Sequence, residues 1–591
     1  MCFWITFSSL NVKSKLQGNW KSADDHPDIV TKLVQEEVAA GFVNQFTGSL
    51  EQARKAWPQG IAVGKLGVQM SEGHDPRLTL DTTVDGVNPG VVIREKPQNP
   101  TPKDVALSFE PLTQLTQDRD NTDYIAFTAD VSKAHKRIRL HPEEQGLLLF
   151  QWMGILYHYK VCHFGGRFSG YWWARMGAYL HRMLHRIIFI SHAGWLYVDD
   201  WLWRFRTDIA PIGAMLTCMS LVAVGCPLSW HKLAYGRAVK WIGLIHNFSE
   251  RTFTIPEDKT ARALEFLQQV GQSDNTFDRH QLQSGTGLLM WLSMLLHLLR
   301  PWLSEFYAAL NRPVSNLVNC SIQQLAEVVD RLSHDLTLKH QCTLSTAGKG
   351  WKLREINHRP ITNIDEAKAS TVRGLGRVWV RLDNPGSTKV RVNDELRISA
   401  KIWHAALAQG PKIIPMLGYA YDTHAAAADA FANDTKSGIG GWLDSGKGQS
   451  ASAVHWFQLL LTPDMFPNSW GMSDNPQRDI TFYELLAQVA LLYCRRLLGG
   501  NKPLQITVCQ LTDNLPGAAV GDKLFTTATP LKYAAQLLAA HATMGEVHVD
   551  IQHIAGVDNI LADKLSRDER PQARVSMKWH ITPGHKIISQ M

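Results

Sequence analysis

Two adjacent carboxylates stand between two apolar runs in the segment 195–204, WLYVDDWLWR, and they constrain the fold more than any other feature. The flanking residues are aromatic and aliphatic types that favour strands, so the segment predicts a tight hairpin with Asp199 and Asp200 at its tip. Neighbouring carboxylates repel one another and lose hydration beside apolar side chains. A solvated acidic turn would relieve that cost, and so would a bound cation.

A third carboxylate favours the cation. The run 124–130, YIAFTAD, predicts a strand that ends in Asp130. Oxygen-only ligands select Mg²⁺, with Mn²⁺ as an alternative, over zinc. Carboxylates on neighbouring strand ends can hold two ions about 3.5–4 Å apart, an arrangement that serves phosphoryl transfer. We therefore expect Asp130, Asp199 and Asp200 to form a two-metal site.

Composition places the chain among globular proteins. The 591 residues suggest about four domains, and 45% hydrophobic with 19% charged residues excludes a wholly disordered, collagen-like or coiled-coil chain. The 8 cysteines include no CxxC spacing, so neither a zinc knuckle nor a disulfide scaffold is supported. The net charge of +7 permits a polyanionic partner without requiring one.

Apolar stretches do not predict a membrane segment. The longest, 288–299, is shorter than the ~20 residues that span a bilayer, and we interpret it as a buried helix. The N-terminal stretch MCFWITFSSL lacks a basic region, so it does not predict a signal peptide. We expect an intracellular protein, cytoplasmic or nuclear or both, that is not secreted and has no membrane partner.

Five ordered motifs surround the acidic pair: FTADVSKAHKRI, HFGGRFSGYWW, YVDD, GCPLSWHK and WIGLI. This order resembles the palm motifs of reverse transcriptases, especially those of retrotransposons and retroviruses. Upstream, PRLTLDTTVDGVNP resembles the fingers of that family; downstream, QLQSGTGLLMWL and LLRPWL resemble its helical thumb. The resemblance implies a right-hand polymerase with fingers, an antiparallel-sheet palm and a helical thumb.

The same resemblance implies roles for individual residues. The metal ions would be bound by Asp130, Asp199 and Asp200. Lys232 matches the lysine that protonates the leaving pyrophosphate. The incoming deoxynucleotide would be bound by Lys65, Arg77, His135 and Gly165. The primer and template would contact Tyr197, Val198, Trp241 and Gly243.

Two positions depart from the family pattern. His135 stands where the family has Phe or Tyr, whose ring excludes a ribose 2′-hydroxyl. The second motif reads Phe164, Gly165, Gly166 and then Ser169-Gly170, where the family has FGL followed by AP. An imidazole is smaller than a phenol ring and can hydrogen-bond a hydroxyl. We therefore expect His135 to be a weaker sugar gate than an aromatic residue.

Four acids of the C-terminal part stand in separate predicted elements. Asp429 precedes a Gly-rich strand pair, and Glu484 opens a helix; Asp513 ends the strand LQITVCQLTD, and Asp563 lies in GVDNILADKLSR. The order resembles the ribonuclease H domain of retroelements, whose signature is met at 559–567, NILADKLSR. The resemblance implies that the four acids bind two Mg²⁺ ions and cleave the RNA strand of an RNA–DNA hybrid.

Three further features of this part have ordinary interpretations beside functional ones. His553 is either a proton carrier near the acids or, as is more usual for a lone histidine, structural. Asp444-Ser445-Gly446 resembles the aspartic-protease triplet, but we interpret it as a turn because Ser-Gly is common turn chemistry. The Ala-rich run before Asp429 is poor strand material, so the first strand of this domain is hard to place.

These expectations combine into an α+β chain: a right-hand polymerase followed by an α/β ribonuclease H-like domain with a mixed sheet. The predicted boundaries are an N-terminal extension at 1–60, fingers and palm at 61–250, a thumb-like region at 251–335, a connection at 336–410, the ribonuclease H-like domain at 411–575 and a tail at 576–591.

The predicted function is that of a retrotransposon enzyme, an RNA-directed DNA polymerase with ribonuclease H activity. Its partners would be an RNA template, a DNA primer, an RNA–DNA hybrid and deoxynucleoside triphosphates, with two Mg²⁺ ions per active site. A viral RNA-dependent RNA polymerase is one alternative, although such enzymes usually carry Gly where Val198 stands. The other is a domesticated or decayed copy that binds nucleic acid without catalysis.

Overall fold

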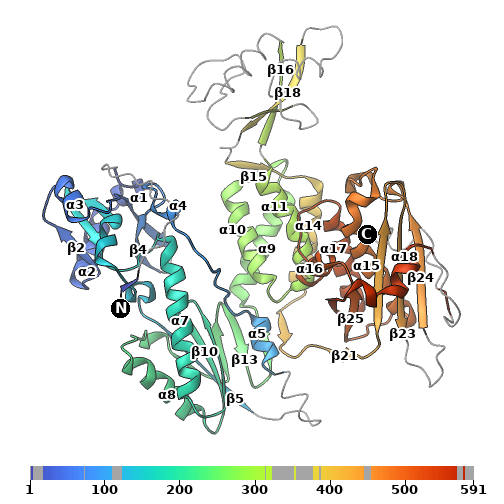
Figure 1. The fold of residues 1–591 in the computed structure, drawn as a ribbon, viewed down its shortest axis with the longest axis horizontal. Coiled ribbons are helices and arrows are strands. Elements are labelled where there is room, and N and C mark those ends of the chain that lie inside the picture. The colour runs from blue at the N-terminus through green and yellow to red at the C-terminus, as the bar shows by residue number, and fades with distance from the viewer. Residues whose placement is uncertain are drawn as a thin grey trace. The chain divides into compact units, whose positions relative to one another are not determined.

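The computed structural model of the protein describes residues 2–3, 18–71, 74–109, 123–312, 314–321, 352–354, 377–384, 388–444, 454–568 and 577–578 (Figure 1). These residues divide into two compact units, Met1–Thr254 with Pro415–Leu417, and Ile255–Ile414 with Gly418–Met591. Helices and sheets occur in both units, so the predicted α+β class is confirmed. The finer domain boundaries stay predictions.

A four-stranded antiparallel sheet, ordered β11-β5-β10-β9, forms the centre of the first unit. Its strands are β5 (Tyr124–Asp130), β9 (His192–Tyr197), β10 (Asp200–Arg206) and β11 (Ala234–Gly236). The hairpin predicted at 195–204 is formed by β9 and β10. Trp201, Trp203 and Phe205 of β10 are fully buried, and helices α7 (Arg167–Ile187) and α8 (Ala210–Ala223) pack against the sheet.

Smaller elements surround this sheet. A hairpin pairs β3 (Lys65–Ser71) with β4 (His74–Asp81), and a second sheet has the order β2 (Val43–Phe46), β8 (Ile155–Tyr159), β7 (Leu149–Trp152). Short parallel pairing joins β1 (Cys2–Phe3) to β6 (Arg139–Leu140), and the meander β12 (Ala238–Trp241), β13 (Leu244–Asn247), β14 (Thr252–Thr254) follows β11. The remaining helices are α1 (Lys21–Asp24), α2 (Pro27–Ala39), α3 (Leu50–Ala56), α4 (Val87–Gly90), α5 (Pro102–Leu107), η1 (Ala134–Arg137), η2 (Pro142–Leu148) and η3 (Trp230–Lys232).

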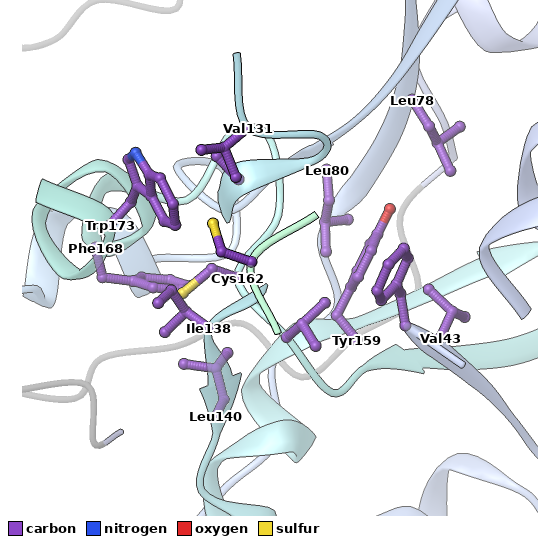
Figure 2. Close-up of a cluster of buried hydrophobic side chains, with 14 of the residues drawn as sticks. Val43, Leu78, Leu80, Val131, Ile138, Leu140, Tyr159, Cys162, Phe168 and Trp173 are labelled. Carbon is purple, nitrogen blue, oxygen red and sulfur yellow. The ribbon is translucent and has the colours of Figure 1, made fainter. Parts of the chain in front are cut away.

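The core of the first unit joins these pieces through large side chains. Figure 2 shows Leu80 of β4, Tyr159 of β8, and Phe168 and Trp173 of α7 in one buried cluster with Cys162. All five are less than 5% exposed. Burying side chains of this size stabilises a fold by roughly 1.5–3 kcal/mol each. Because Leu80 of β4 and Cys162 of the loop before α7 belong to the same cluster, this burial holds that loop against the β3–β4 hairpin.

The second unit begins with helices α9 (Glu257–Gln272), α10 (Arg279–Leu292) and α11 (Leu303–Asn311), later joined by α14 (Asp394–Leu407). The single helix predicted at 288–299 is wrong, because α10 ends at Leu292 and the 3₁₀ helix η4 (His297–Trp302) follows. The Ser293 hydroxyl donates a 2.6 Å hydrogen bond to the Met290 carbonyl, a local bond that competes with helix continuation. Short strands here are β15 (Thr276–Asp278), β16 (Val314–Ser321), β17 (Lys352–Arg354), β18 (Arg377–Asn384), β19 (Lys389–Arg391) and β20 (Ile413–Pro415).

The predicted mixed sheet occupies the C-terminal part of this unit, ordered β21-β25-β22-β23-β24-β27, with β26 also pairing β25. Its strands are β21 (Ala420–Asp422), β22 (Ala426–Ala432), β23 (Ser437–Asp444), β24 (Val454–Leu461), β25 (Ile506–Thr512), β26 (His548–His553) and β27 (Met577–Lys578). The helices are α15 (Ile480–Leu498), α16 (Leu515–Lys523), α17 (Leu531–Gly545), α18 (Ile560–Ser566) and the 3₁₀ helices η5 (Pro463–Met465), η6 (Asn468–Trp470), η7 (Pro476–Asp479) and η8 (Gly556–Asp558).

A buried ion pair connects the sheet domain to the preceding helices. Lys532 of α17 donates a 2.5 Å hydrogen bond to Glu305 of α11, and both side chains are at most 5% exposed. Removing one partner of such a pair leaves a buried charge, which costs about 3–5 kcal/mol. This contact, together with the packing of α17 on η4, holds the two regions together within one compact unit. Among the described helices, none has the length and apolar character needed to cross a bilayer.

Candidate active sites

The hairpin between β9 and β10 brings the first three acids together. Asp200 begins β10 directly opposite Asp130, the last residue of β5. Carboxylate oxygens of Asp130, Asp199 and Asp200 all lie within 4.8 Å of one another. Val198 has a left-handed φ of 55°, which is strained for a β-branched residue. The Trp173 indole holds that turn by donating a 2.7 Å hydrogen bond to the Val198 carbonyl.

The electrostatics of this group fit a divalent cation. Burial, followed by repulsion from Asp199 and Asp130, raises the pKa of Asp200 to about 6, and burial with Asp130 also raises the pKa of Asp199. The Lys232 ammonium donates a 3.1 Å hydrogen bond to Asp130 and balances at most one of the three charges. Hard divalent ions prefer such oxygen donors, so these residues fit Mg²⁺ or Mn²⁺.

A cavity of about 220 Å³ opens beside the acids, lined by Thr128, Ala129, Asp130, Asp200, Trp201, Lys232, Lys240, Trp241, Ile242 and Gly243. The Trp241 indole donates a 3.2 Å hydrogen bond to the Asp200 carbonyl, and its ring contacts Tyr197 edge-on at 6.4 Å. Left-handed φ angles at Ile242 (45°) and Gly243 (83°) form the tight turn between β12 and β13. The predicted primer-contacting residues therefore lie together at the acids.

Lys240 is a lining residue that the sequence analysis missed. It precedes the motif WIGLI by one position on β12, and a lysine on an exposed strand face carries little signal by itself. It lines the same cavity as Asp130 and Asp200, and a lysine ammonium can bind phosphate as a point charge.

His135 lies on η1 close to the acids. Its ring contacts Phe164 edge-on at 5.7 Å. Burial lowers the pKa of His135, although the nearby Asp199 charge acts in the opposite direction. The His135 ring therefore lies near the Asp199 carboxylate, and its role as a sugar gate stays a prediction.

The other predicted nucleotide-binding residues lie on the β3–β4 hairpin and the loop before α7. The Arg77 guanidinium lies 5.7 Å from the Phe164 ring, so Arg77 and His135 share that neighbour. The Lys65 ammonium lies 4.9 Å from the Trp20 ring. The cation–π contact orients each side chain without neutralising its charge.

Gly165 is required by an internal contact. Its φ is 105°, and a Cβ there would lie 2.1 Å from the Leu80 carbonyl oxygen. The Asn88 amide donates a 2.7 Å hydrogen bond to the Gly165 carbonyl. The family resemblance predicts this glycine for backbone approach to a base pair, whereas the close approach in the structure is to Leu80 of β4. A cavity of about 580 Å³ adjoins it, lined by Thr83, Asn88, Pro89, Gly165, Gly166 and Arg167.

The second acidic group is built on β22, α15 and the end of β25. Oxygens of Asp429, Glu484 and Asp513 lie within 4.8 Å of one another. Asp429 lies inside the strand β22, because the Ala-rich run predicted to be poor strand material forms part of that strand; the shorter β21 precedes it in the same sheet. The small, buried residues of β22 allow α15 and α18 to pack closely on it. This segment forms a strand because of its tight packing and not because of the intrinsic strand propensity of its residues.

Asp563 lies outside this close group. Its carboxylate accepts a 2.8 Å hydrogen bond from Arg567, and it acts on Asp429 through charge. Helix α18 lies directly on β23, since a Cβ at Gly440 would be 2.3 Å from the Ser566 nitrogen. The Ser566 hydroxyl can then donate a 3.0 Å hydrogen bond to Asp429.

Burial gives this group its electrostatic character. Desolvation, followed by repulsion from the other acids, raises the pKa of Glu484 to about 9 and that of Asp429 to about 7. One Glu484 oxygen is buried without a hydrogen-bond partner among the described residues. An oxygen-only set with an unpaired buried carboxylate fits a hard divalent cation.

Gln488 is a second residue that the sequence analysis missed. It lies one turn after Glu484 on α15 and is 1% exposed. Its amide donates 3.2 Å hydrogen bonds to the carbonyls of Ala428 on β22 and Leu511 on β25. These strands share a single paired position, Ala427 with Leu511. Gln488 therefore joins the three elements that carry the acids.

The two remaining predicted features are His553 and the Asp444-Ser445-Gly446 triplet. His553 is exposed, and its Nε2 lies 3.1 Å from the Asp513 carbonyl, so it borders the second group. Asp444 is the last residue of β23, while Ser445 and Gly446 lie outside the described residues.

Comparisons with known proteins give distant likenesses. No family model matches the sequence, and no curated protein matches it. A foamy viral protease-reverse transcriptase structure (dRH) with double-stranded DNA is 13% identical, with a TM-score of 0.42, over 93% of this chain and 73% of its own. Another foamy viral protease-reverse transcriptase structure, with an RNA/DNA hybrid, is 14% identical, with a TM-score of 0.37. That match covers 95% of this chain and 79% of the other chain.

Proposed function

We propose that the chain is a retroelement reverse transcriptase, of the retrotransposon type, with ribonuclease H activity. The observation that carries this proposal is the presence of two separate carboxylate groups, each with three acids within 4.8 Å. One group lies at the ends of β5 and β10, and the other on β22, α15 and the end of β25. Both groups consist of acids that the ordered motifs predicted. A protein that only binds nucleic acid gains nothing from burying mutually repelling carboxylates, because their desolvation destabilises the fold.

In the polymerase site, Asp130, Asp199 and Asp200 would hold the metal ions. Bound Mg²⁺ supplies Lewis-acid stabilisation of the attacking and leaving oxygens in phosphoryl transfer. Lys232 is positioned by Asp130 and would donate a proton to the leaving pyrophosphate. Tyr197 and the Trp241–Gly243 turn would hold the primer end, and Lys65, Arg77 and His135 the deoxynucleotide.

In the ribonuclease site, Asp429, Glu484 and Asp513 would hold the ions, with Asp563 at the outer edge. The RNA strand of a hybrid is recognised through 2′-hydroxyl and backbone contacts. Ser566 fixes the Asp429 carboxylate by its hydrogen bond. His553 borders this group at the Asp513 carbonyl and would serve as a proton carrier there.

Primer extension tests the proposal. Purified protein is given an RNA template, a DNA primer and deoxynucleotides, with Mg²⁺ or with a chelator; hybrid cleavage is assayed in the same preparations. We expect both activities in Mg²⁺ and neither with the chelator. Tight hybrid binding without either activity would favour the decayed, non-catalytic alternative, and extension of RNA primers with ribonucleotides would favour the RNA polymerase.

A further inference from the structure

Three histidines form a cluster on the first unit that the proposed function does not use. His181 and His185 lie one turn apart on α7, and His192 begins β9. The Nε2 atoms of His181 and His185 are 3.0 Å apart, and His185 Nδ1 is 2.8 Å from His192 Nε2. All three rings contact the buried Trp203, with centroids 5.5, 5.1 and 5.4 Å away.

The backbone fixes the protons at one end of this cluster. The Ile190 carbonyl lies 2.7 Å from His192 Nδ1, and since a carbonyl only accepts, that nitrogen carries the proton. A neutral His192 then has a lone pair on Nε2, so His185 donates to it from Nδ1. The Nε2 of His185 is left with a lone pair that points toward His181.

At the His181 end of the cluster, no placement of the ring proton gives every nitrogen a hydrogen-bond partner. If His181 donates from Nε2 to His185, its Nδ1 has no proton. That Nδ1 is buried without a hydrogen-bond partner at normal distance among the described residues. The backbone of Gly194 faces this ring and favours a proton on it. A proton on Nδ1 would instead leave two Nε2 lone pairs facing each other, an arrangement that a cation between them would stabilise.

We propose that His181 and His185 chelate a borderline transition-metal ion, with Zn²⁺ as the representative, through their facing Nε2 atoms. Two nitrogens that each lie about 2.0–2.1 Å from a tetrahedral zinc are roughly 3.3–3.4 Å apart, so the two rings need to separate only slightly from the observed 3.0 Å to admit the ion. Histidines at i and i+4 on one helix face are a known zinc-binding arrangement. Imidazole suits this ion class, whereas the carboxylate groups suit Mg²⁺.

The surroundings complete the site. The bond from His185 Nδ1 to His192 is the outer-shell contact that orients a metal-binding imidazole, and His192 is in turn held by Ile190. His185 is exposed, so an ion has access from solvent. The remaining coordination positions would be taken by water. Because His192 begins β9, a bound ion would fasten α7 to the strand that leads to the acidic hairpin.

Calorimetric titration of tag-free protein with Zn²⁺, in excess Mg²⁺, tests the site. Wild type is compared with His185→Gln, His181→Gln and a control, His280→Gln, which changes an exposed histidine at the start of α10. We expect the affinity for one equivalent of Zn²⁺ to fall at least tenfold in the first two variants and to be unchanged in the control. His192→Ala should weaken it by about 10–100-fold, as an outer-shell partner does.

The variants also separate binding from folding. His185 is exposed, so His185→Gln should keep the wild-type circular dichroism spectrum and metal-free melting temperature. Zn²⁺ should raise the melting temperature of wild type and of His280→Gln, but not that of His185→Gln or His181→Gln. Identical titrations and identical Zn²⁺-dependent shifts in wild type and His185→Gln would overturn the proposal.

Discussion

The side-chain amide of Gln488 donates a 3.2 Å hydrogen bond to the carbonyl of Ala428, the residue before Asp429. Gln488→Met keeps the side-chain length but removes the donor. Two buried carbonyls lose a partner, which should cost about 1–3 kcal/mol of stability. Because Asp429 and Glu484 are then less well positioned, the Mg²⁺ concentration for half-maximal hybrid cleavage should rise roughly 10–100-fold.

Metal titrations of cleavage separate these two effects. The control is Gln552→Met, which removes an exposed amide of β26. Primer extension should be unaffected in both variants. A Gln488→Met protein that melts earlier but needs the wild-type Mg²⁺ concentration would show that Gln488 only stabilises the fold.

Glu484→Gln should raise the stability of the metal-free protein while abolishing hybrid cleavage. The pKa of Glu484 is about 9, above its ordinary value of 4.5. The unfolded chain therefore releases this proton at lower pH than the folded one, and wild-type stability falls as pH rises between these values. In Glu484→Gln the side-chain amide does not titrate, so the variant does not lose stability over this pH range. Gln488 and the other acids stay in place.

Thermal unfolding at pH 5 and pH 8 in chelator measures this effect. The melting temperature of Glu484→Gln should exceed that of wild type at pH 8 and converge toward it at pH 5. A variant less stable than wild type at pH 8 would contradict the assignment of Glu484 as a desolvated, repelled carboxylate.

Asp563 should matter less than Asp429, because Asp563 lies outside the close group and is paired with Arg567. Asp563→Asn should slow hybrid cleavage by about 10–100-fold, as expected for an outer partner, and Asp429→Asn by more. Single-turnover rates at saturating Mg²⁺ provide the comparison, with the exposed Asp558→Asn as a control. Equal losses in the first two variants would mean that Asp563 moves into the metal site when substrate binds.

His135 should act as a weak sugar gate. His135→Ala should increase ribonucleotide incorporation and His135→Phe should decrease it, since the ring size at this position sets the space for a 2′-hydroxyl. The ratio of kcat/KM for matched deoxy- and ribonucleotides measures the effect as a free-energy difference. An unchanged ratio in His135→Ala would leave only its packing on Phe164 as a role.

The sequence predicted the acids better than their supports. Asp130, Asp199 and Asp200 follow from local strand patterns and motif order, as do Glu484 and Asp513. Gln488 could not be predicted, because a single amide on a helix gives no local sign that it joins two strands. The strand β22 was obscured because alanine has low strand propensity, and only the close packing of α15 and α18 favours it there.

Two further predictions missed a contact, one local and one long-range. The apolar run 288–299 has the composition of one helix, yet the Ser293 hydroxyl and the following turn divide it. The need for glycine at position 165 was predicted, but its contact partner, Leu80, lies 85 residues earlier in the chain. Long-range partners of this kind are not encoded in local spacing.

The central claim is that the chain contains two independent metal-dependent active sites, and paired variants test it most directly. Primer extension on an RNA template and hybrid cleavage are measured for Asp199→Asn and Glu484→Gln, with Asp208→Asn as a control at an exposed carboxylate beyond β10. We predict that Asp199→Asn abolishes extension and keeps cleavage, that Glu484→Gln does the reverse, and that Asp208→Asn keeps both. Extension by Asp199→Asn at the wild-type rate would contradict the account.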